Sequence, residues 1–170
     1  GALFSPGTKL DGARFVGCTC GEAATLIHAI QGSGTASPED GNLHTIEGIV
    51  VGDFQGTDHL SGFFVQEEGV DWDEDDATSE GIFVYEGFSS LLDVELGDLV
   101  RVTGEGDEYY DLTEIKYLTD LVLCSTGHPT TTVPVTLPES EDGELEQYEG
   151  MLVEVTNDMT VAQNYFLGRY

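Results

Sequence analysis

The sequence predicts an all-β domain, a small barrel or sandwich built from five main strands. Glycine is abundant, with 22 in 170 residues, and strongly helical stretches are few. Short runs of β-branched and aromatic residues recur, each bounded by Gly, Asp or Asn, which is the pattern of strands joined by turns. The five main runs, with turn signals between them, all lie between residues 45 and 118. Such close spacing is typical of a small barrel or sandwich.

The main strands are predicted at residues 45–54, 62–67, 80–85, 98–105 and 112–118. Glycines within the first run indicate the bends or bulges that a tightly coiled strand needs. The fourth run follows the turn signal Leu96-Gly97-Asp98, and the fifth alternates apolar with polar residues. Two shorter extended pieces follow at residues 122–124 and 133–135. Pro134 predicts an edge strand for the second piece, because proline cannot donate to a ladder.

This strand pattern fits more than one architecture. A meander followed by two more strands fits an OB-fold-like five-stranded Greek-key barrel. It also fits an SH3-like barrel or an incomplete Ig-like sandwich, and the pattern alone does not choose among them. Residues 22–32, before the first strand, are compatible with either a short helix or a strand, and residues 32–42 form a loop rich in Gly, Ser and Pro.

A short internal echo predicts the domain organisation. The segment Ile46-Glu47-Gly48-Ile49-Val50-Val51 is similar to Tyr148-Glu149-Gly150-Met151-Leu152-Val153, and residues 144–148 are compatible with one helical turn. We therefore expect a second β module, the start of a second barrel, after Pro138. The predicted parts are an N-terminal extension (1–24), the barrel (25–125), and a linker with the incomplete second module (126–170).

The charge balance restricts the classes of partner. The chain carries 33 acidic and 5 basic residues, a formal net charge of -28. A basic surface that displaces counterions from phosphate is therefore excluded as a general description. The charge also disfavours anionic membranes, and no apolar run approaches the roughly 20 residues of a membrane helix. We interpret the acidity as an adaptation to a salty medium, with a cation-binding or partner-binding face as the alternative.

The chain ends and the cysteines predict a fragment of a secreted protein. Residues 1–7 lack the features of a signal peptide, and the apolar, aromatic residues 164–170 run to the last position. Cys18 and Cys20 are too close in sequence for a relaxed mutual bridge. We therefore expect one long-range disulfide from either of them to Cys124. The odd count then leaves one thiol over, or one whose partner lies outside this fragment.

A dense run of carboxylates predicts a candidate calcium loop. Asp71, Asp73 and Asp75 have the alternating spacing with which a curled chain converges on one hard cation. The remainder of a calcium loop is missing, because Asp76 replaces the glycine of the sixth position and Ile82 the glutamate of the twelfth. Glu80 is the candidate substitute for that glutamate. The alternative is a solvated acidic loop between two strands.

The sequence contains no catalytic constellation. The four histidines are scattered, none has a neighbouring nucleophile, and no phosphate loop, nucleophile elbow or zinc-protease motif occurs. Aromatic residues in the strands are candidates for stacking on single-stranded bases. Phe63 and Phe64 face opposite sides of their strand, so one belongs to the core. The candidate nucleic-acid contacts are Phe63, Tyr85, Arg101, Tyr109 and Lys116, with Arg101 pointing outward if its neighbours point inward.

Several ordered motifs together resemble one known family. They are Ile27-His28-Ala29-Ile30-Gln31-Gly32, Glu47-Gly48-Ile49-Val50-Val51, Gly62-Phe63-Phe64-Val65-Gln66, Asp76-Ala77-Thr78-Ser79-Glu80-Gly81 and Gly97-Asp98-Leu99-Val100-Arg101-Val102-Thr103-Gly104. From about Cys20 onward the chain resembles the YhcR-type OB-fold domain of secreted bacterial, ExeM-like extracellular nucleases.

The resemblance implies a non-catalytic accessory barrel that presents DNA or positions a nuclease domain. That endonuclease/exonuclease/phosphatase-type domain uses magnesium or another divalent metal, and none of its motifs occurs in this sequence. The implied partners are DNA, bound weakly or with the help of cations, and the catalytic domain in cis. The resemblance also implies that Cys20 pairs with Cys124. A calcium-stabilised extracellular adhesion or scaffold module is the alternative function.

Overall fold

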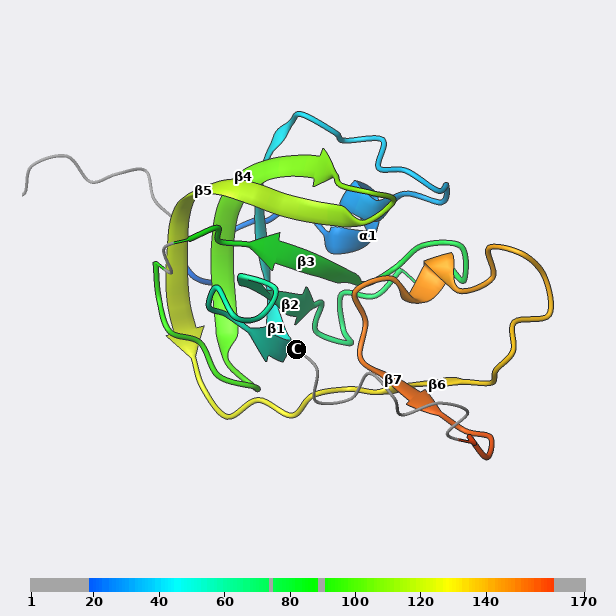
Figure 1. The fold of residues 1–170 in the computed structure, drawn as a ribbon. Coiled ribbons are helices and arrows are strands. Elements are labelled where there is room, and N and C mark those ends of the chain that lie inside the picture. The colour runs from blue at the N-terminus through cyan, green and yellow to red at the C-terminus, as the bar shows by residue number, and fades with distance from the viewer. Residues whose placement is uncertain (1–18, 74, 89–90, 161–170) are drawn as a thin grey trace, which may run out of the picture.

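The computed structural model describes residues 19–73, 75–88 and 91–160. Its architecture is mostly β, and five strands form one closed ring in the order β1-β2-β3-β5-β4 (Figure 1). These strands are β1 (Leu43–Phe54), β2 (Gly62–Gln66), β3 (Gly81–Tyr85), β4 (Leu99–Glu108) and β5 (Thr113–Ser125). All neighbours in the ring are antiparallel except β3 and β5, which pair in parallel through two residue pairs. The predicted all-β class is confirmed.

The sequence pattern predicted that the fifth strand ends at residue 118, which is too early. Residues 122–124 are the continuation of β5 rather than a separate piece, and they pair with β4 like the residues before them. The register shifts opposite Gly104, where Tyr117 adopts a φ of 48°. This irregularity interrupts the alternation, and the pattern therefore suggested that the strand had ended.

The ambiguous segment before the first strand contains a short helix, α1 (Ile27–Gln31). It lies at one end of the ring beside β3 (Figure 1). Ile27 and Ile30 on its inner face are fully buried and join the core cluster inside the ring. Among the described residues, no helix is long and apolar enough to cross a membrane.

After the ring, β6 (Val133–Val135) and β7 (Val153–Val155) form a separate two-stranded parallel sheet, with the 3-10 turn η1 (Glu146–Tyr148) between them. This sheet lies outside the ring (Figure 1). The buried Gln66 of β2 holds the segments just before β6 and just before β7 on the ring. Its side-chain amide donates to Thr131 O and accepts from Leu152 N. A Cβ at Gly81 would collide with the backbone of Gly150, so this close approach requires glycine.

Candidate binding groove

Alternation along three neighbouring strands divides apolar core residues from a second, outward set. Phe63, Val65, Ile82, Val84 and Ile115 point into the ring and are fully buried. Because successive strand residues face opposite sides, their neighbours share the outer face of β2, β3 and β5. That outward set consists of Phe64, Phe83, Tyr85, Glu114 and Lys116.

The outer face contains a cavity of about 390 Å³. Loop residues complete its walls, with Leu60 from the β1–β2 connection and Tyr109 and Leu112 from the β4–β5 connection. The full lining is Leu60, Phe64, Phe83, Tyr85, Asp107, Tyr109, Leu112, Glu114, Lys116 and Tyr117. We call this cavity the aromatic groove. Its volume falls within the usual range for small-ligand pockets.

Aromatic side chains dominate the walls of the aromatic groove. The rings of Phe64 and Phe83 are 4.9 Å apart between centroids and tilted by 50°. The Phe83 side chain is almost wholly buried, whereas Tyr109 is 56% exposed and Tyr117 is 70% exposed. The phenylalanines therefore form the packed wall. Tyr109 remains available to cover one face of a ligand ring, whereas Lys116 lies over the ring of Tyr117.

The polar groups of the groove consist of one ion pair and one lone carboxyl. Lys116 Nζ lies 2.6 Å from the Asp107 carboxylate and 4.8 Å from the Tyr117 ring centroid. The hydrogen bond to Asp107 is the main reason that the pKa of Lys116 is raised. Glu114, opposite Phe83 in the parallel pairing, is only 5% exposed. Burial, aided by the Asp107 charge, raises the pKa of Glu114 to about 7. No described residue donates a hydrogen bond to its carboxyl.

Unusual backbone conformations gather around the same groove. In the described ranges, four non-glycine residues have φ between 48° and 64°, namely Ser61, Tyr110, Asp111 and Tyr117. Tyr117 lines the groove, and the other three are sequence neighbours of residues that do. Such conformations are found preferentially at ligand sites, where the surrounding structure holds them in place.

The structure brings together three of the five residues predicted to contact nucleic acid. Tyr85, Tyr109 and Lys116 all line the aromatic groove. The prediction that Phe63 contacts nucleic acid is wrong, because its side chain is fully buried in the core. Its neighbour Phe64 occupies the groove instead. The sequence analysis missed Glu114, and it counted Phe83 among the candidate stacking aromatics without including it in the predicted contacts. Alternation places Phe83 on the face of Tyr85 and Glu114 on that of Lys116.

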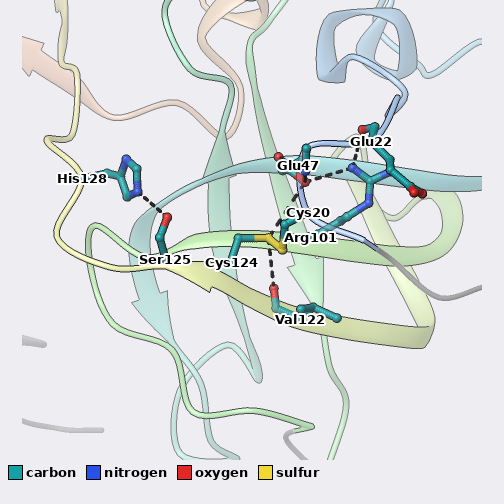
Figure 2. The surroundings of a disulfide bond; sticks show 9 residues. Cys20, Glu22, Glu47, Arg101, Val122, Cys124, Ser125 and His128 are labelled. Atoms are coloured by element: carbon teal, nitrogen blue, oxygen red, sulfur yellow. Dashed lines mark hydrogen bonds and ion pairs between the residues drawn. A yellow bond between two sulfur atoms is a disulfide. The ribbon is translucent and has the colours of Figure 1, made fainter.

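The prediction that Arg101 contacts nucleic acid is also wrong. It points outward from the ring as alternation predicted, but only 3% of its surface is exposed. Figure 2 shows its guanidinium enclosed by acceptors: Nη1 donates to Glu47 Oε2 and Glu22 O, and Nη2 donates to Ala23 O. The N-terminal segment therefore covers Arg101, and no phosphate can reach it.

A disulfide joins Cys20 to Cys124 beside this arginine (Figure 2). It is the pairing that the family resemblance implied, and it connects the N-terminal segment to the end of β5. Cys18 lies outside the described residues. Disulfides persist in oxidising compartments, so the bridge indicates an extracellular-type environment.

The acidic loop brings together two of its four predicted ligands. Asp73 and Glu80 lie with His28 in a group whose ligand atoms are all within 4.8 Å of one another. Among the described residues, Asp71 and Asp75 join no such group. His28, which the sequence analysis missed, reaches the loop from α1, and its Nδ1 is 3.0 Å from Glu80 Oε2.

Backbone amides and a hydroxyl occupy much of the carboxylates' hydrogen-bonding capacity. Asp73 Oδ1 accepts from Asp75 N, Asp75 Oδ1 accepts from Ala77 N, and Thr78 Oγ1 donates to Asp73. Burial acts to raise the pKa of Asp73, but the bonds from Asp75 and Thr78 help to lower it below its ordinary value. The alternating aspartates thus stabilise tight turns, the usual local role of aspartate.

Neither a family model, nor a curated protein, nor a solved structure matches this chain.

Proposed function

We propose that the chain is a non-catalytic OB-type module of a secreted protein, and that it positions a metal-dependent nuclease domain in cis. The closed ring with the order β1-β2-β3-β5-β4 carries this proposal, because it is the arrangement expected of a five-stranded Greek-key OB barrel. The aromatic groove adds support. It lies on the β2–β3 face between the β1–β2 and β4–β5 loops, where OB barrels bind their ligands.

The charges of the module favour a role in positioning the nuclease domain over a role in binding DNA. In the described part of the chain, Arg101 and Lys116 are the only lysine or arginine side chains. Arg101 is paired with Glu47 and Lys116 with Asp107. Phosphate binding relies on basic groups that displace counterions, so this module is poorly equipped for it. DNA is therefore proposed as a weak partner that needs cations to screen the protein's charge.

A calcium-stabilised adhesion or scaffold module is the second candidate function. The convergence of Asp73 and Glu80 with His28 favours it, because two carboxylates already share one site. The hydrogen bonds within the loop weigh against it, since they hold the turns without an ion.

The test is an assay of hydrolysis and binding on the purified chain. Single- and double-stranded DNA are incubated with magnesium and with calcium, and binding is measured by fluorescence anisotropy across a salt series. We expect no cleavage, and only weak binding that increases when divalent cations are added. Cleavage that survives repeated purification would overturn the non-catalytic assignment. Tight binding that weakens as salt rises, without a need for divalent cations, would overturn the positioning role.

A further inference from the structure

The walls of the aromatic groove can accept a ring that presents an apolar face. Tyr109 and Tyr117 expose most of their surface at its rim, and Phe64 and Phe83 form its packed wall. The face of an aromatic ring carries partial negative charge and attracts weakly positive C–H groups. A nucleobase can stack on such a ring through its own π face, and a sugar ring can pack the C–H groups of one face against it, so the polar groups decide between them.

The charges of the groove oppose an anionic ligand. Asp107 neutralises Lys116 at 2.6 Å, and Glu114 adds a second carboxyl that shares the charge of this same lysine. The net charge of -28 on the whole chain repels a polyanion at longer range. A single strand of DNA would therefore place its phosphates where no basic side chain is free to receive them.

A cationic ligand is also disfavoured, although acidic groups surround an aromatic wall. Lys116 Nζ lies 4.8 Å from the Tyr117 ring centroid, which is the position that a bound cation would take. The groove therefore already contains its own ammonium group. Exclusion of both charged classes leaves an uncharged ligand.

The unpartnered carboxyl of Glu114 indicates what the uncharged ligand must offer. Its side chain is buried, lines the groove and accepts no hydrogen bond from any described residue. Its carboxyl oxygens remain accessible to water in the groove. A ligand hydroxyl that donates a hydrogen bond to this carboxyl can therefore take the place of that water. The neighbouring Lys116–Asp107 pair supplies one further donor and one further acceptor for adjacent hydroxyl groups.

We propose that the aromatic groove binds a neutral oligosaccharide, with Tyr109 against a sugar ring and Glu114 accepting a hydrogen bond from a sugar hydroxyl. The site would attach the module, and any domain joined to it, to an uncharged polysaccharide. This function goes beyond the positioning of a nuclease domain and does not depend on it.

The test is native gel electrophoresis of the purified chain in gels that contain laminarin, soluble starch, dextran or galactomannan. At least one of these neutral polysaccharides is expected to retard the chain. Calorimetry with a hexasaccharide of the retarding polymer then gives the affinity. Tyr109→Ala is expected to weaken binding about tenfold or more, as truncation of an aromatic contact residue commonly does. Glu114→Gln is expected to weaken it by a smaller factor, because the amide keeps one acceptor oxygen.

Phe88→Ala is the matched control, since Phe88 is 87% exposed and does not line the groove. It is expected to bind like the unmodified chain, and the melting temperature of each variant confirms that it folds. The absence of retardation by all four polymers would overturn the proposal, as would binding that Tyr109→Ala and Glu114→Gln leave unchanged. Retention of a 12-nucleotide dT strand through the same residues, without polysaccharide binding, would instead assign the groove to DNA. Neither result affects the separate assay for cleavage.

Discussion

Arg101 and Glu47 face each other across the β1–β4 pairing, and Arg101 Nη1 donates to Glu47 Oε2 at 2.9 Å. The same carboxylate accepts from Gly21 N with both oxygens, and Arg101 holds the carbonyls of residues 22 and 23. One ion pair on the outer face of the ring therefore fixes the N-terminal segment beside the disulfide. Its role is structural, and it removes Arg101 from any binding surface.

We predict that Arg101→Met lowers the free energy of unfolding by about 3–5 kcal/mol, the usual effect of leaving one member of a buried ion pair alone. Glu47 would keep its charge, and two backbone carbonyls would lose their donor. Urea denaturation with the disulfide intact measures this change. Glu47→Gln/Arg101→Met removes both charges and should be less damaging than the single variant. A change below 1 kcal/mol would show that the N-terminal segment does not cover Arg101.

The disulfide should stabilise the ring by joining chain segments that are far apart in sequence. Cys20 and Cys124 are separated by 104 positions, so the bridge restricts a large loop in the unfolded chain. We predict that Cys20→Ser/Cys124→Ser lowers the free energy of unfolding by about 2–5 kcal/mol. Mass spectrometry under non-reducing conditions should recover a peptide pair that contains these two cysteines. Recovery of Cys18 bound to Cys124 would contradict the structure.

The sequence predicted which face each strand residue takes, but not what lies over that face. Strand alternation correctly pointed Arg101 outward, yet its exposure depends on residues 79 and 78 positions earlier, in a segment that folds back over β4. No local pattern encodes such a contact. Likewise, two adjacent phenylalanines must face opposite sides, but alternation alone cannot say which one is inside. That choice depends on the closure of the ring, which is a property of all five strands together.

The assignment of Phe63 to the core and Phe64 to the groove gives a direct test. We predict that Phe63→Ala lowers the free energy of unfolding by about 3–5 kcal/mol, because it leaves a cavity in a closed core. Phe64→Ala should destabilise the fold clearly less, since its ring lies in the wall of a surface groove between Phe54 and Phe83. Urea denaturation of both variants measures the difference. Equal losses would show that both rings belong to one core.

The acidic loop illustrates a different limit of sequence reasoning. The alternating aspartates resemble half of a calcium loop, but the same spacing also forms consecutive tight turns. We predict that any calcium-dependent rise in melting temperature is abolished by Asp73→Asn/Glu80→Gln and unchanged in Asp71→Asn. Melting with calcium and with sodium at equal ionic strength measures it. Loss of the calcium effect in Asp71→Asn would restore the full set of ligands that the sequence suggested.

Two buried carboxyls should make the protein more stable in mild acid than in base. Burial is the main cause that raises the pKa of both Glu67 and Glu114 from 4.5 to about 7. Between these values the folded state binds more protons than the unfolded state, so the free energy of unfolding falls as the pH rises. Repulsion among the surplus carboxylates acts in the same direction, and a variant must separate the two effects.

Glu67→Gln/Glu114→Gln makes this separation, because the amide of residue 67 can still accept the hydrogen bond from Ile27 N. We predict that the melting temperature of the unmodified chain rises as the pH falls from 8 to 5.5 at constant ionic strength. The double variant should melt higher than the unmodified chain at pH 8 and close to it at pH 5.5, which gives a shallower dependence on pH. If both proteins showed the same slope, these two carboxyls would not set the pH response, and it would come from repulsion across the surface or from Glu149, whose pKa burial also raises to about 7.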